Sequence, residues 1–253
     1  LKEEFLRRGV SVDHIICKRY TEMDIPENIT AKQMYDELTA AMAGKGHCYL
    51  LLDEIQEIDG WEKAINSLLE GADADIYVTG SNSKLMSSEI STYLTGRYVS
   101  IPVYTLSFKE YLAFKQDSSL SRRELLEEYI RFGGFPIVAL SEYDEQSAYQ
   151  IVNGIYHTVV SRDIVKRHRI NKQDLFDRVV KYIIENMGKT FSANSISTFL
   201  KSEHRKVSVE SIYNYLRWLE QAFIIYPCER YDLQGKSILK TQEKYYLSDV
   251  SFK

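Results

Sequence analysis

Hydrophobic and polar positions follow two periods along the first half of the chain. Short apolar runs, typical of strands, alternate with longer stretches whose apolar residues recur every three or four positions, as in helices. This alternation predicts an α/β core built on a parallel sheet. We expect strands at His14 to Cys17, Tyr49 to Leu52, Ile76 to Val78 and Tyr98 to Val103, and helices at Ala31 to Met42, Trp61 to Leu69, Lys84 to Leu94 and from Ser107, where Glu110 completes a capping box.

The pattern changes after residue 118. Gln116 to Ser119 has the composition of a linker, and the stretch from Ser121 to Ile170 is helical in pattern, with one break at 133–136. Three amphipathic helices and two strands follow, an order typical of a winged helix-turn-helix. We therefore divide the chain into an α/β core (1–118), a helical lid-like segment (119–170) and a winged-helix domain (171–253). The last domain is expected to hold helices at Leu175 to Asn186, Ser192 to Leu200 and Val209 to Phe223, and strands at Phe223 to Tyr226 and Lys244 to Leu247.

Two adjacent carboxylates follow the second predicted strand. The four apolar residues from Tyr49 to Leu52 indicate a strand buried on both faces, so that Asp53 and Glu54 emerge at its carboxyl end, where α/β sheets bind ligands. Asp53 is suited to hold Mg²⁺ directly or through water, and Glu54 to orient a water that attacks a phosphate. An ordinary strand followed by an acidic turn is the alternative.

A second polar group follows the third predicted strand. Ser81 and Asn82 come after Asp75 to Val78, and an amphipathic helix separates that strand from the Asp53 strand. If the two strands are neighbours, Asn82 lies beside Asp53 and Glu54 and can bond a phosphate oxygen or the attacking water. Ser and Asn also form turns and helix N-caps, which is the structural alternative.

Several sequence runs together resemble a known family. In chain order they are LLLDEIQEIDGWEKAI (50–65), YVTGSNSKLMSSE (77–89), LTGRYVSIPVYTLSFKEYL (94–112), RFGGFP (131–136) and SRDIVKR (161–167). The set is similar to that of prokaryotic AAA+ superfamily ATPases related to the archaeal ATPases, and it covers nearly the whole chain. The resemblance implies a P-loop core, then a winged helix, then a C-terminal nuclease-like domain.

The resemblance also implies roles for single residues. Asp53 and Glu54 correspond to the Walker B carboxylates, and Asn82 corresponds to sensor 1. Arg97 and Arg162 are candidates for a phosphate-sensing or finger arginine, although an arginine near a strand start is also a common ion-pair partner. The implied function is a molecular switch that binds and hydrolyses ATP with Mg²⁺, as a homo-oligomer or with a protein partner.

One motif of such ATPases has no match in the sequence. This is G-x-x-x-x-G-K-[ST], the loop whose backbone amides bind the phosphates. Gly44-Lys45-Gly46 lacks the upstream glycine and the following Ser or Thr, and fits a helix C-cap and turn better. By the resemblance, the loop lies just before Leu1, and the nuclease-like domain follows Lys253. We therefore expect an internal fragment that by itself binds ATP weakly or not at all.

Composition narrows the class of protein. The 253 residues are 44% hydrophobic and 27% charged, enough for one good core and a second smaller one. There is no run of eighteen apolar residues, so we expect no membrane span and a cytoplasmic location. The cysteines at 17, 48 and 228 are odd in number and lie in apolar runs, which predicts reduced, buried thiols.

Charge bears on DNA binding, the second candidate function. Residues 172–253 hold 13 Lys and Arg against 10 Asp and Glu, whereas the whole chain has a net charge of −4. The third helix of this domain, however, carries Glu210 and Glu220 beside Arg217 on its predicted exposed face. The alternative to the ATPase is therefore a DNA-binding winged-helix regulator with a structural or inactive NTPase core. A protein-interaction role for the winged helix is equally open.

Overall fold

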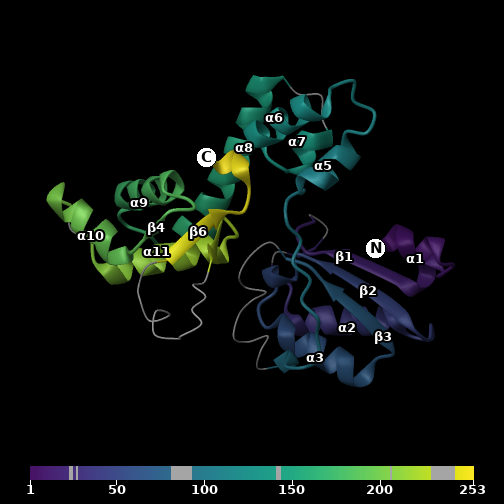
Figure 1. Cartoon of the computed structure of the whole chain (residues 1–253). Coiled ribbons are helices and arrows are strands. Elements are labelled where there is room, and N and C mark those ends of the chain that lie inside the picture. Colours follow the sequence, from purple (N-terminus) through teal and green to yellow (C-terminus); the bar gives the residue numbers. More distant parts are fainter. Residues whose placement is uncertain (23–24, 27, 81–92, 141–143, 206, 229–242) are drawn as a thin grey trace, which may run out of the picture. The chain divides into compact units, whose positions relative to one another are not determined.

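The structure is a computed structural model that describes the chain apart from residues 23–24, 27, 81–92, 141–143, 206 and 229–242, and apart from the side chains of residues 162 and 163. Two units follow one another, Leu1–Ser100 and Ile101–Lys253 (Figure 1). Each unit is described by itself below.

Three parallel strands form the sheet of the first unit. They are β1 (Ile15–Arg19), β2 (Cys48–Asp53) and β3 (Ala74–Val78), in the order β1-β2-β3 (Figure 1). The register sets Arg19 opposite Asp53, and Leu52 opposite Val78. The carboxyl ends of all three strands therefore meet at one edge, with β2 in the middle, as the alternation of apolar runs predicts.

Helices cover the two faces of this sheet unequally. Helices α2 (Ala31–Met42) and α3 (Trp61–Gly71) pack their apolar sides on one face, against Leu50 and Leu52. On the other face α1 (Lys2–Arg7) brings only Phe5, whose ring lies 4.4 Å from that of Tyr49. Side chains along β2 consequently alternate between buried and half-buried. The prediction of a strand buried on both faces was wrong, because a six-residue helix covers little of the second face.

The segment after β3 departs from the sequence expectation. The predicted helix Lys84 to Leu94 lies mostly outside the described residues. The strand predicted at Tyr98 to Val103 was also wrong: this segment pairs with no strand in the described part of the chain, and Val99 and Val103 are 86% and 92% exposed. A strand exists only where a neighbouring edge accepts its hydrogen bonds, which an apolar pattern does not reveal.

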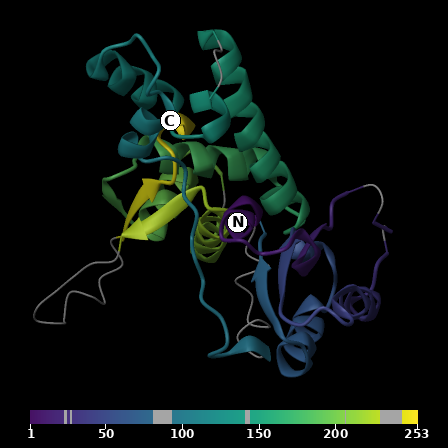
Figure 2. The same ribbon diagram turned by 90° about the vertical axis from the view of Figure 1, so that its right-hand side faces the viewer.

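Helices open the second unit. They are α5 (Phe108–Phe114), α6 (Arg122–Phe132), α7 (Pro136–Leu140) and α8 (Glu145–Thr158), and α8 runs without a break into a π-helix (Val159–Lys166), visible as one long helix in Figure 2. The predicted capping box of Ser107 and Glu110 begins α5. Tyr111 of α5 packs with Leu125 and Ala139. The division between units consequently falls after Ser100, whereas the sequence pattern placed it after residue 118.

The rest of the second unit holds its largest core. Helices α9 (Gln173–Glu185), α10 (Ala193–Ser202) and α11 (Val209–Gln221) accompany an antiparallel sheet of β4 (Thr190–Phe191), β5 (Ile225–Cys228) and β6 (Glu243–Leu247), in the order β4-β6-β5. The three predicted helices and two predicted strands are present, and β4 is an addition. Fully buried side chains from each helix fill the core, among them Phe176, Ile183, Ile196, Ile212 and Leu219.

The end of the chain is tied to the turn between α6 and α7. The buried Asp249 carboxylate accepts a hydrogen bond from the Gly134 amide at 2.9 Å and two from Ser251. Gly133 has a φ of +76°, and a Cβ there would lie 1.8 Å from Asp249 Oδ1. The Gly-Gly break therefore makes room for a carboxylate more than a hundred residues later in the chain.

The structure bears on two expectations from composition, one about membrane-spanning helices and one about the cysteines. None of the helices in the described part of the chain combines the length and the apolar character needed to cross a membrane. All three cysteines are free thiols, but only Cys48 is buried, so the prediction of burial was wrong for Cys17 and Cys228. Cys17 lies on the sheet face that α1 leaves partly open.

Candidate functional site

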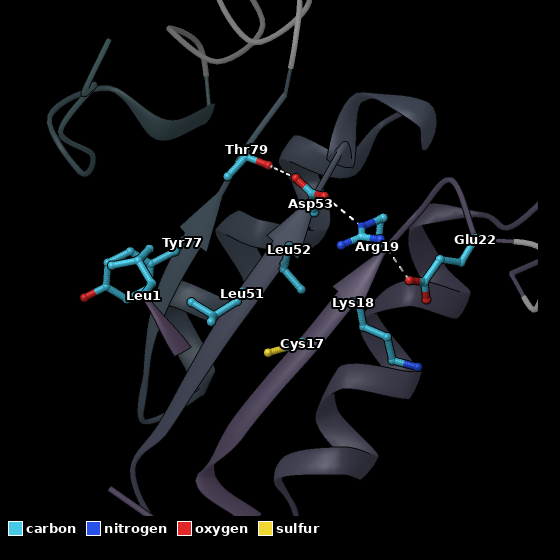
Figure 3. A pocket seen from close by; sticks show the side chains of 10 residues that line it. All are labelled: Leu1, Cys17, Lys18, Arg19, Glu22, Leu51, Leu52, Asp53, Tyr77 and Thr79. Atoms are coloured by element: carbon cyan, nitrogen blue, oxygen red, sulfur yellow. Dashed lines mark hydrogen bonds and ion pairs between the residues drawn. The ribbon is translucent and has the colours of Figure 1, made fainter. Parts of the chain in front are cut away.

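The Asp53 carboxylate is contacted from both neighbouring strands. Arg19, at the end of β1, donates a hydrogen bond from Nε to Asp53 Oδ2 at 3.1 Å. Thr79, directly after β3, donates its hydroxyl to Asp53 Oδ1 (Figure 3). The side chain of Asp53 is nevertheless 46% exposed, so that solvent and ligands reach it.

Backbone hydrogen bonds fix the position of this edge. The Thr79 amide donates to the Leu52 carbonyl at 2.9 Å, and the Ile55 amide donates to the Thr79 carbonyl at 3.2 Å. On the other side, the Tyr20 amide donates to the Asp53 carbonyl at 3.1 Å. The strands thus remain paired up to their last residues, and Asp53 stands on a rigid element, as a ligand-binding site requires.

Glu54 adopts an unusual backbone conformation. Its φ of 54° and ψ of 42° are left-handed, which for a residue with a side chain costs on the order of 1–3 kcal/mol. A 3₁₀ turn (Ile55–Glu57) follows, and the amide of the buried Gln56 donates to Glu54 Oε2. The chain turns sharply at Glu54 and holds its carboxylate in a set direction.

A cavity of about 340 Å³ opens beside these residues. Its wall includes apolar side chains of the open sheet face, such as Leu51 and Tyr77, and its rim includes Asp53, Arg19 and Thr79 (Figure 3). Apolar walls with a few convergent polar groups are typical of ligand sites.

The other predicted site residues have varied positions. Ser81 and Asn82 lie outside the described residues, although β2 and β3 are neighbours, as their predicted role requires. Arg97 donates to Asn66 at 3.0 Å and pairs with Glu70 at 3.2 Å, both on α3. Arg162 belongs to the π-helix of the second unit. Of the predicted set, the structure thus places Asp53 and Glu54 at the carboxyl edge of the sheet and gives Arg97 an ion-pair partner on α3.

Three residues at this edge have no prediction from the sequence. Thr79 fits a turn by pattern alone, and only the parallel register shows that its hydroxyl meets Asp53. Gln56 lies between Ile55 and Glu57 and has no motif of its own. Arg19 precedes Asp53 by 34 residues, so its role depends entirely on strand pairing.

The oxygen atoms at this edge suit a small hard cation as ligands. Carboxylate and hydroxyl oxygens, from Asp53 and Thr79, are the ligands that Mg²⁺ prefers. A phosphate-binding loop, by contrast, has no counterpart at Gly44-Lys45-Gly46. Gly44 has a φ of +76°, and the Lys45 amide bonds the Met42 carbonyl at 3.1 Å, as in a turn that ends a helix.

Family comparisons cover both units. Residues 123–253, more than half of the chain, match the model of a family described as a domain of unknown function, DUF8612. The chain belongs to the DUF8612 family. Residues 11–112 match the model of a family described as an AAA domain. The AAA match contains β1, β2 and β3 with the Asp53 edge, and the DUF8612 match contains the second unit from α6 onward.

Two curated relatives of this DUF8612 chain are uncharacterized proteins. One, from Haemophilus influenzae, is 40% identical over 203 residues, which are 79% of this chain and 50% of the relative. The other, from Methanocaldococcus jannaschii, is 34% identical over 233 residues, 88% of this chain and 52% of the relative. The chain spans about half the length of these relatives.

A solved structure shares the fold. The Walker-type ATPase of Pyrococcus abyssi has a TM-score of 0.59 and 14% identity, over 99% of this chain and 86% of that one. The AAA match over residues 11–112 and this shared fold support a P-loop NTPase fold of the AAA-like superfamily. The candidate site lies where proteins of this class bind their ligands, at the carboxyl edge of the parallel sheet.

Proposed function

We propose that the first unit contributes to a Mg²⁺-dependent ATPase and that Asp53 and Glu54 are its Walker B carboxylates. The observation that carries this proposal is the position of Asp53, which ends the central strand of a parallel sheet and meets Arg19 and Thr79 from both neighbours. The AAA match over residues 11–112 supports the same function.

Each residue of the edge has a chemical role in this proposal. Asp53 holds the metal directly or through a coordinated water, and Thr79 orients the Asp53 carboxylate. Glu54 orients and polarises the water that attacks the terminal phosphate, and Gln56 keeps the Glu54 carboxylate in place. Bound Mg²⁺ neutralises charge on the phosphate oxygens.

Residues beyond the described edge complete the proposal. Asn82 follows Thr79 by three positions and is proposed to bond a phosphate oxygen or the attacking water, with Ser81 as a second nucleotide contact. Arg162, whose side chain lies outside the described residues, stays a candidate for the phosphate-sensing or finger arginine. Arg97 is the weaker candidate for that role, because its guanidinium already pairs with Glu70.

The test is ATP turnover by the full-length gene product, alongside its Glu54→Gln variant. The variant keeps the shape of the side chain but lacks the charge that polarises water. Turnover is expected to fall by at least a hundredfold, with ADP affinity unchanged within about twofold, because general-base assistance contributes on the order of 10²- to 10⁴-fold. Equal turnover in both proteins contradicts the assignment.

DNA binding is the second candidate, and the topology of the second unit favours it. The order α9-β4-α10-α11-β5-β6, with the sheet order β4-β6-β5, supports the predicted winged helix-turn-helix. The exposed face of α11 carries Arg217 between Glu210 and Glu220, which repel phosphates. DNA binding through phosphate contacts predicts an affinity that falls steeply with salt as counterions are released. Flat salt dependence would instead favour a protein-interaction role.

A further inference from the structure

Arg19 stands between two carboxylates. Its Nε donates to Asp53 Oδ2 at 3.1 Å, and its Nη1 lies 3.4 Å from Glu22 Oε1 (Figure 3). Glu22 belongs to the turn that follows β1, where its amide donates to the Arg19 carbonyl at 3.2 Å. The side chains of Arg19 and Glu22 are 60% and 52% exposed, so both have room to move.

The Arg19 contact competes with a metal at Asp53. A guanidinium is a permanent cation that fits a carboxylate, and here it uses Oδ2 while the Thr79 hydroxyl uses Oδ1. A divalent cation on the same carboxylate would stand next to a like charge, which raises the cost of binding. The cavity rim offers an alternative partner, since Glu22 already contacts the same guanidinium.

We propose that Arg19 is a positioning residue that acts as the internal counter-ion of Asp53 and turns toward Glu22 when a divalent cation binds. This inference rests on the proposed ATPase site. In the metal-free protein Arg19 pairs with the Asp53 carboxylate and holds it in place. When the cation binds, Glu22 holds the displaced guanidinium at the rim of the site.

The proposal makes predictions of opposite sign for the two partners. Arg19→Ala removes the cation that competes with Mg²⁺ for Asp53, so a lower Mg²⁺ concentration fills the site. Glu22→Gln weakens the contact between residue 22 and the Arg19 guanidinium, so Arg19 stays on Asp53. A higher Mg²⁺ concentration is then needed to fill the site. Arg19→Lys keeps a cation but loses the planar fork, and its effect is smaller than that of Arg19→Ala.

The experiment uses the full-length gene product and a fluorescent ADP analogue. The readout is the Mg²⁺ concentration that gives the half-maximal tightening of analogue binding. We expect this concentration to fall about 1.5- to 5-fold in Arg19→Ala, the range set by exposed ion pairs, and to rise by up to about twofold in Glu22→Gln. Arg8→Ala, which removes another exposed arginine paired with a carboxylate in the same unit, is the control and is expected to leave it unchanged.

The Asp53→Asn variant separates failure of this inference from failure of the proposed function. If Asp53→Asn removes the effect of Mg²⁺ while Arg19→Ala and Glu22→Gln match the wild type, the counter-ion role is wrong and the metal site stands. If Mg²⁺ acts equally on wild type and Asp53→Asn, the proposed function itself fails. Changes of the same sign in Arg19→Ala and Glu22→Gln indicate a structural role only and overturn the inference.

Discussion

Gln56 donates a hydrogen bond from its side-chain amide to the carboxylate of Glu54, two residues earlier in the chain. Gln56 is only 1% exposed, and Glu54 sits in a left-handed backbone conformation. Strain of this kind persists only where surrounding contacts hold it. The pair therefore sets the direction of the Glu54 carboxylate before any ligand is present.

Gln56→Glu tests this orienting role with little change of shape. The new carboxyl group donates a hydrogen bond only when protonated, and when ionised it repels Glu54. We expect turnover at neutral pH to fall about tenfold to a hundredfold, which corresponds to the ~1.5–3 kcal/mol of a hydrogen bond to a charged group. Activity should recover partly as the pH is lowered.

The matched control for Gln56→Glu is Gln33→Glu, which changes the same side chain in the α2 capping box. It is expected to leave the pH profile of turnover unchanged. A Gln56→Glu enzyme with the wild-type pH profile and rate shows that the amide does not orient Glu54.

Asp249 and Gly133 predict where the second unit is vulnerable. Gly133→Ala places a Cβ on the Asp249 carboxylate and requires a left-handed alanine. We expect a loss of about 2–4 kcal/mol in the free energy of unfolding. Urea unfolding is followed by the fluorescence of Trp218, in protein that also carries Trp61→Phe. Because Trp218 is then the single tryptophan, its signal reports the unfolding of the second unit alone.

The control for that prediction is another glycine of the same unit. Gly154 lies within α8, and a Cβ there meets open space. Gly154→Ala is expected to stabilise the unit by about 0.5–1 kcal/mol, because alanine favours helix more than glycine does. If Gly133→Ala and Gly154→Ala shift the urea midpoint alike, the contact between Gly133 and Asp249 has no stabilising role.

His47 predicts a pH dependence in the first unit. Its Nδ1 donates to Asp73 Oδ1 at 2.7 Å, Nε2 lies 3.8 Å from Asp75 Oδ2, and these carboxylates raise the pKa of the imidazole above its usual value. The His14 ring bonds the His47 carbonyl at 2.9 Å. Because the pKa is higher in the folded state, the added stability is fully present below the unfolded pKa of about 6.5 and is lost as pH rises through the folded pKa.

Thermal unfolding of wild type and Asp73→Asn between pH 5 and 8.5 tests this. Asp73→Asn removes the largest cause of the shift, so the difference in Tm should be greatest at pH 5 and shrink toward pH 8.5. Asp36→Asn, on α2, removes another exposed carboxylate and serves as the control. A difference that grows with pH contradicts the predicted sign.

Local signals in the sequence predicted most of the elements. Ser107 with Glu110 caps a helix where the pattern places it, because this contact forms within three residues. Residues 98–103 have an equally clear apolar pattern but form no strand in the described structure. The difference is that a strand depends on a partner elsewhere in the chain, whereas a capped helix satisfies its own hydrogen bonds.

The same distinction applies to the candidate site. Asp53 and Glu54 are visible in sequence because they directly follow an apolar run. Arg19 and Thr79 reach Asp53 only through the parallel register, and Gln56 reaches Glu54 only because the chain turns through a left-handed residue. The contacts that position the carboxylates therefore depend on the fold, and the sequence pattern alone does not predict them.

The most direct test of the account is steady-state ATP turnover by the full-length gene product with and without Mg²⁺, for wild type, Glu54→Gln and Glu57→Gln. Glu57 is an exposed glutamate three residues later and is the matched control. The account predicts Mg²⁺-dependent turnover that Glu57→Gln retains and Glu54→Gln loses, while all three proteins bind ADP alike. Turnover in Glu54→Gln at the wild-type rate, or none in folded wild type that binds ADP, would contradict it.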